Sequence, residues 1–163
     1  MRISFMTFTC PNWDLKRIIR GAKDYGYDGV EIRVASGHQH GIELETGTMQ
    51  RRFAKNFFKE NDLEISCLST SLTFSSSKEE ERRRNVGTLR EYIKLASDIG
   101  ATRIRVFGGA IPPEVKREEC LNYVGESLLE AADTAKDFGV SVLLETHDDF
   151  SLGVDVGKIL RRV

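Results

Sequence analysis

Short apolar runs with a period of two alternate along the chain with longer runs in which apolar residues recur every three or four positions. The first pattern is typical of strands and the second of amphipathic helices. Strands are predicted at 2–8, 29–33, 63–69 and 102–109 and from Val140 to Glu145. Helices are predicted from an N-cap at Asn12 to Gly26, at 48–60, 79–99 and about 115–138, and from near Val154.

The junctions between these elements repeat one arrangement. In YGYDGVEI, IGATRIRV and FGVSVLLE a helix ends at a glycine, a short link follows, and an apolar strand begins. Strands that alternate with helices at this pace form parallel βαβ units. No linker composition interrupts the series, so residues 1–163 are expected to form a single α/β domain.

The two faces of the predicted strands differ in polarity. One face is apolar, as expected beneath helices, whereas Glu31, Arg33, Arg105 and Glu145 share the opposite face with other side chains. An open sheet covered on both sides would be apolar on both faces. The mixed face instead suits the interior of a (β/α) barrel. No G-x-G-x-x-G motif follows the first strand, which disfavours a dinucleotide-binding fold.

The stretch VSVLLETHDDF (140–150) carries the clearest candidate chemistry. Glu145 and His147 project to the same side where the apolar run stops, and ligands of parallel α/β proteins bind outside the carboxyl ends of the strands. The alternative is a polar strand end that caps the following helix. Arg33, at the end of its own strand, suits recognition of a phosphate or carboxylate. His38 lies in the loop that follows and is a candidate for substrate contact.

Composition narrows the function classes. The formal net charge of −1 gives no basic excess for nucleic acid, and no apolar run reaches membrane-spanning length. Three widely spaced cysteines do not form a disulfide framework, which favours a reducing cytoplasm. We therefore expect a cytoplasmic protein without nucleic-acid or membrane partners.

GYDGVEIR, GATRIRVFGG and VLLETHDDFS, in this order and spacing, resemble the sugar phosphate isomerase/epimerase family of xylose isomerase-like TIM barrels. The resemblance implies metal-dependent proton transfer next to the carbonyl of a small sugar, sugar phosphate or polyol. In that family a divalent metal (Mn, Mg, Zn or Co) is held by Glu, Asp, His and Glu on successive strands. Glu145 matches the first ligand and is thereby also implied in catalysis, with Arg33, His38 and His147 as substrate-binding candidates.

The sequence departs from the family pattern after its fifth strand. The later strands that would bring the remaining ligands are missing from these 163 residues, so the chain resembles the N-terminal part of a (β/α)8 barrel. One carboxylate does not make a tight metal site, and weak or absent metal binding is expected. Whether this chain is itself an enzyme stays open.

Two further interpretations remain beside the isomerase or epimerase. The first is a truncated, non-catalytic barrel that self-associates, because five strands do not close a barrel and would leave two edges and an uncovered inner layer. That layer would contain Met6, Phe8, Leu68, Phe107 and Leu143, and a homodimer is the expected assembly. The second is a nuclease resembling the apurinic endonucleases of this barrel class, which the charge and the lack of other ligand clusters disfavour.

Overall fold

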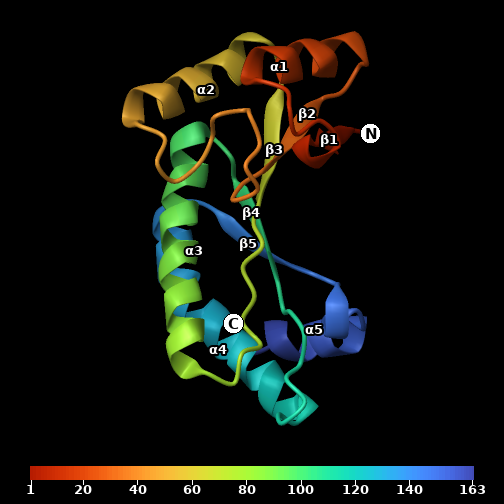
Figure 1. Cartoon of the computed structure of the whole chain (residues 1–163), viewed down its shortest axis with the longest axis vertical. Coiled ribbons are helices and arrows are strands. Elements are labelled where there is room, and N and C mark those ends of the chain that lie inside the picture. Colours follow the sequence, from red (N-terminus) through yellow and green to blue (C-terminus); the bar gives the residue numbers. More distant parts are fainter. The chain divides into compact units, whose positions relative to one another are not determined.

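The computed structural model describes all 163 residues as an α/β fold in which five parallel strands alternate with helices (Figure 1). The strands are β1 (Ser4–Met6), β2 (Gly29–Arg33), β3 (Glu64–Ser69), β4 (Arg103–Phe107) and β5 (Ser141–Glu145). The helices are α1 (Leu15–Asp24), α2 (Thr48–Glu60), α3 (Glu79–Ile99), α4 (Arg117–Asp137) and α5 (Gly153–Leu160). Short 3₁₀ turns, η1 (Thr7–Thr9) and η2 (Asp148–Phe150), follow β1 and β5. The strand order β1-β2-β3-β4-β5 confirms the predicted parallel α/β class.

The chain divides into two compact units. The first comprises Met1–Thr70 and Lys94–Ile104, and the second comprises Ser71–Ile93 and Arg105–Val163. Strands β1 to β3 with α1 and α2 belong to the first unit, and β5 with α4 and α5 belongs to the second.

In the first unit, β2 lies between β1 and β3 and contributes a fully buried apolar face. Val30 and Ile32 are 0% exposed, which confirms that they lie beneath other elements. The register of β2 and β3 skips Ser66, because Val30 is opposite Ile65 whereas Glu31 is opposite Cys67. Simple alternation does not anticipate such an irregularity, which shifts which β3 side chains meet the polar face of β2.

Helix α1 begins later than predicted. Its N-cap is Asp14, whose Oδ1 accepts the Arg17 N–H at 2.8 Å, and not Asn12. Both residue types are strong N-caps, so the sequence pattern alone did not separate them. The helix ends as predicted, with Gly26 at φ 73°, in the left-handed region that glycine adopts without steric cost.

Helix α2 has the predicted bounds, but its apolar repeat does not face the core. Met49 and Phe53 are 82% and 53% exposed, and the buried face carries Ala54 and Phe58. The i, i+4 spacing of Met49, Phe53 and Phe57 is that of a core stripe. The α2 surface instead presents an aromatic strip to solvent, since Phe53 and Phe57 stack with ring centroids 5.3 Å apart.

The second unit is built on the predicted helix faces. The apolar stripe of α4 is buried and contains Leu121, Val124, Leu128, Ala131 and Ala135. Helix α5 packs against α4 (Figure 1), with Val156 and Ile159 buried. After β3, the connecting segment runs beside β4: Phe74 N–H donates to the Gly108 carbonyl at 3.0 Å, and Phe107 N–H donates to that of Leu72 at 2.9 Å.

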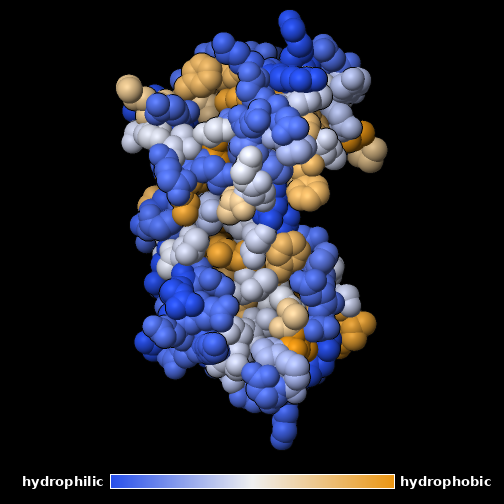
Figure 2. All heavy atoms as spheres, in the orientation of Figure 1, coloured by the Kyte–Doolittle hydropathy of each residue, from blue (hydrophilic) through white to orange (hydrophobic).

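Hydrophilic side chains predominate on the face shown in Figure 2, with apolar side chains among them. Exposed apolar residues include Phe53 and Leu152. No helix combines the length and the apolar character needed to cross a membrane. The three cysteines are buried and free, so the prediction that they form no disulfide framework is confirmed.

Gly108 admits no side chain because a Cβ there would lie 2.4 Å from the ring of Phe150, which is fully buried. We expect Gly108→Ala to lower the free energy of unfolding by about 1–3 kcal/mol through overpacking. Gly87, within α3, has open space around its Cβ position. The matched change Gly87→Ala should therefore raise stability by about 0.5–1 kcal/mol, since alanine favours helix. Urea unfolding of both variants tests this, and equal effects would contradict it.

Candidate functional site

In the second unit, polar and aromatic side chains meet at the ends of β4 and β5. Arg105 Nε donates to Glu145 Oε2 at 2.7 Å. The arginine side chain is only 10% exposed and that of Glu145 is 40% exposed. The guanidinium therefore fixes the carboxylate from the protein side while the carboxylate stays accessible to solvent.

Phe107 joins this ion pair to His147. The Arg105 guanidinium lies 4.2 Å from the centroid of the Phe107 ring, and the His147 ring lies 5.0 Å from the same ring. A cation over an aromatic face is attracted by the ring quadrupole. Glu145 and His147 thus share one side with Arg105 and Phe107, as the alternation along both strands predicted. We call these four residues the β4–β5 cluster.

The chain turns sharply after this cluster. Asp148 has φ 48°, which is uncommon for a residue other than glycine, and its Oδ1 lies 2.8 Å from Nδ1 of His147. The carboxylate thereby holds the imidazole in one orientation. His147 is 56% exposed in its side chain, so the ring is both oriented and accessible.

In the first unit, Arg33 ends β2 in a network of hydrogen bonds. Its Nη1 donates to the Ser69 carbonyl at 3.1 Å, and its backbone N–H donates to Oγ1 of the buried Thr7 at 2.9 Å. The Ser69 hydroxyl in turn donates to Glu31. Ser69 lies opposite Arg33 in the register of β2 and β3, where Leu68 would lie if Ser66 were not skipped.

His40 holds the loop after β2 by both ring nitrogens. Ile42 N–H donates to Nδ1 at 3.0 Å, so Nδ1 is unprotonated, and Nε2 donates to the Arg33 carbonyl at 2.8 Å. This pattern specifies the neutral Nε2–H tautomer. Burial lowers the pKa of His40, and neighbouring His38 lowers it further. The residue is 4% exposed and its role is structural.

His38 lies between two rings in the same loop. Its ring centroid is 6.0 Å from that of Phe8 and 5.7 Å from that of His40. Burial, then the charge of Arg33, lowers the pKa of His38. Its Nδ1 is buried without a hydrogen-bond partner.

The candidate residues fall into two pairs. Arg33 and His38 lie together in the first unit, and Glu145 and His147 lie together in the second. The sequence reasoning did not identify Glu145 as a partner of Arg105. The alternation of side chains along the strands predicted that both residues lie on one face, and this pattern was the signal from which their pairing could have been inferred.

The residues present do not fit a divalent metal by themselves. No group of three or more His, Cys, Asp or Glu side chains is placed to hold an ion. Glu145, the one predicted ligand, already accepts from Arg105. A cation bound there would share this carboxylate with a guanidinium.

The family described as xylose isomerase-like TIM barrel matches residues 19–163. No curated protein sequence matches the chain. Solved structures share its fold. L-ribulose 3-epimerase has a TM-score of 0.80 at 19% identity, covering 99% of this chain and 56% of its own. D-psicose 3-epimerase, solved in the presence of D-fructose, has a TM-score of 0.80 at 13% identity, covering 99% and 60%.

The IolI protein with a bound zinc atom also matches, with a TM-score of 0.75 at 19% identity, covering 88% of this chain and 51% of its own. The chain thus spans about half the length of the solved structures it matches. At these identities the likeness concerns the fold.

The neutral state of His40 predicts a pH-dependent stability. Its pKa is lowered in the folded state, so the unfolded chain binds more protons between that lowered pKa and the ordinary value of about 6.5. The contribution of neutral His40 to the free energy of unfolding is therefore fully present above about pH 6.5. It decreases as the pH falls through this window, with a slope of at most about 1.4 kcal/mol per pH unit.

His40→Gln should remove most of this slope, because glutamine does not titrate. His38→Gln is the matched control and should remove less, since His38 is less buried. Urea unfolding between about pH 5 and pH 7.5 measures both slopes. An unchanged slope in His40→Gln would show that another group titrates.

Proposed function

Because the chain belongs to the xylose isomerase-like TIM barrel family, we propose that it supplies one part of a site that isomerises or epimerises a small sugar or sugar phosphate. The observation that carries the proposal is the β4–β5 cluster, in which an accessible carboxylate at the end of β5 is oriented by a buried arginine. Enzymes that move a proton next to a carbonyl need such a positioned base.

In the proposed reaction Glu145 removes the proton from the carbon next to the substrate carbonyl. The electron pair of the broken C–H bond moves toward the carbonyl oxygen and an enediolate forms. The proton returns to the neighbouring carbon for isomerisation, or a second acid returns a proton to the opposite face for epimerisation. Arg105 acts as a positioning residue, since its contact is with Glu145.

Three other side chains suit substrate binding. His147 is exposed, oriented by Asp148, and adjacent to Phe107, so it can bond a sugar hydroxyl. In the first unit, His38 is half-buried and lies near the charge of Arg33. Arg33 carries a charge suited to a phosphate or carboxylate, although its Nη1 also serves Ser69.

A divalent metal in this family polarises the oxygens of the substrate. The chain contributes Glu145 at most to such a site. Three free cysteines support a reducing compartment, for which we propose the cytoplasm.

Sugar binding tests this proposal directly. We expect L-ribulose and D-fructose to shift the backbone amide signals of residues 145–148 in an ¹⁵N NMR titration, with a Kd of about 1–10 mM, as suits few contacts. Glu145→Gln should weaken binding about tenfold, because a bond to a charged group is stronger than one to an amide. A sugar alcohol without a carbonyl serves as the comparison ligand.

Glu130→Gln is the matched control variant. Glu130 is also paired with an arginine, Arg90, at 3.3 Å, and its side chain is 51% exposed. It lies on α4, away from the strand ends. Equal losses in both variants, or no shift at residues 145–148 with any ketose, would contradict the proposal.

We also infer that the chain self-associates, the second role that the sequence left open. Phe8 in the first unit is 64% exposed and Leu143 in the second is 41% exposed, so each unit presents an apolar side chain to solvent, whereas Met6 and Phe107 are half-buried. Leu68 was wrongly placed in the predicted uncovered layer, since it is 0% exposed. Exposed apolar side chains next to strands favour association.

Sedimentation equilibrium at about 10–100 μM should give a dimer, the most frequent closed assembly. Phe8→Ser should shift the equilibrium toward monomer, because it removes apolar area from the interface. Phe53→Ser, at a similarly exposed phenylalanine on α2, should leave it unchanged. A monomer at every concentration would overturn the inference.

A further inference from the structure

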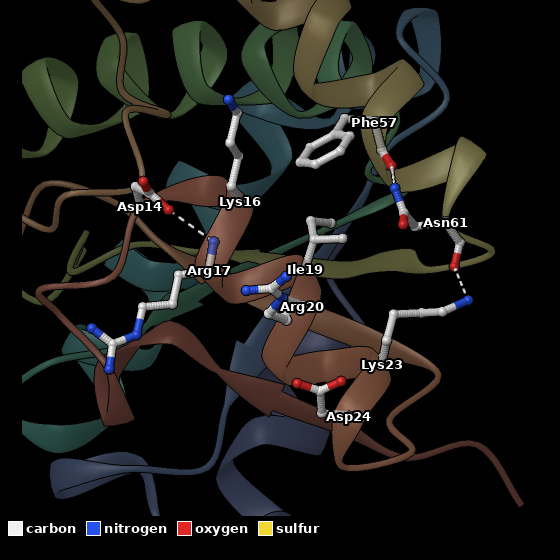
Figure 3. A pocket seen from close by; sticks show the side chains of 9 residues that line it. All are labelled: Asp14, Lys16, Arg17, Ile19, Arg20, Lys23, Asp24, Phe57 and Asn61. Carbon is white, nitrogen blue, oxygen red and sulfur yellow. Dashed lines mark hydrogen bonds between the residues drawn. The ribbon is translucent and has the colours of Figure 1, made fainter.

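A groove of about 810 Å³ lies between α1 and α2 in the first unit, far along the chain from the β4–β5 cluster (Figure 3). Four cations of α1 line it: Lys16, Arg17, Arg20 and Lys23. Its apolar part is formed by Ile19, which is 3% exposed, and by Phe57 of α2. Figure 3 shows the Phe57 ring turned toward α1 above Ile19.

None of these four cations forms an ion pair, although Asp14 and Asp24 line the same groove. Lys23 Nζ donates to the Asn61 carbonyl at 2.9 Å. The Arg17 guanidinium lies 4.7 Å from the centroid of the Trp13 ring. Both contacts leave the positive charge without an anionic partner.

The spacing of these charges opposes helix formation. Lys16 and Arg20 are four residues apart and Arg20 and Lys23 are three apart, so like charges are neighbours on the helix surface. Such pairs destabilise a helix by about 0.2–0.5 kcal/mol each. An anion bound between these side chains would reduce their repulsion and would therefore stabilise α1.

The opposite wall of the groove is aromatic. Phe57 stacks on Phe53, whose ring lines an adjoining groove of about 320 Å³ that shares Asp14 and Lys16 with the first. The two grooves therefore adjoin at Asp14 and Lys16, and each has one ring of the stacked pair Phe53 and Phe57 in its α2 wall. Of the exposed stripe, Phe57 lines the first groove and Phe53 lines the second, whereas Met49 lines neither.

We propose that this groove binds a nucleoside phosphate. Its volume lies in the range of about 300–1,000 Å³ typical of small-ligand sites. The planar base packs on the half-buried ring of Phe57, and the phosphates bind Arg20 and Lys23. The carboxylate of Asp24 accepts from a ribose hydroxyl or a base amino group. Two carboxylates in the lining disfavour a long polyanion such as RNA.

Titration calorimetry with ADP tests the site, with adenosine and inorganic phosphate as partial ligands. We expect ADP to bind one site per chain with a Kd of about 0.1–1 mM, and each partial ligand to bind at least tenfold more weakly. Amide signals of α1 and of residues 57–61 should shift in the NMR spectrum. Phosphate binding as tight as that of ADP would reduce the site to an anion patch and overturn the proposal.

Variants separate the two walls of the groove. Arg20→Gln combined with Lys23→Gln should weaken ADP at least tenfold, and Phe57→Leu should weaken ADP without changing phosphate. Arg52→Gln is the control, because Arg52 is an exposed α2 cation outside both grooves. Circular dichroism verifies folding. Equal loss in the control, or tighter binding of a single-stranded RNA oligomer than of ADP, would overturn the proposal. The outcome of the ADP titration does not depend on whether the protein binds a ketose.

Discussion

Parallel strands that bury one face beneath helices are the constraint on which the rest of the structure depends. Val30 and Ile32 in β2, and Ile104 and Val106 in β4, leave no apolar area exposed. Each buried side chain of this size contributes about 1.5–3 kcal/mol of transfer free energy. Once these faces are covered, polar side chains can occupy the opposite face of each strand and the strand ends without disrupting the core.

Much of the fold could be predicted because it follows from local rules. The bounds of α2 and α3 agree with the apolar spacing and the flanking residues, and Gly26, Gly100 and Gly139 adopt positive φ after their helices as their sequence places suggest. The face shared by Arg105, Phe107, Glu145 and His147 follows from period two alone. Such features depend on residues that are close in the sequence, so they can be predicted from one amino-acid sequence.

The rest depends on contacts between distant residues. The choice of Asp14 over Asn12 as N-cap, the skipped Ser66 and the role of His40 each require the folded surroundings. Helix spacing could not show that the α2 stripe faces solvent, because an apolar stripe has the same period whether it faces solvent or the core. His38 and His40 are only two residues apart, and they differ in role because His40 is buried and His38 is partly exposed.

The backbone at Asp148 has a consequence for how this region can change. A left-handed conformation costs a residue with a Cβ about 1–2 kcal/mol, somewhat less for aspartate, whose short side chain bonds locally. Glycine would relieve that cost but would abolish the carboxylate that orients His147. Chain rigidity and imidazole orientation are therefore coupled at one position. Any mutational path that loosens this turn also frees the ring, so the turn and the histidine can be expected to vary together.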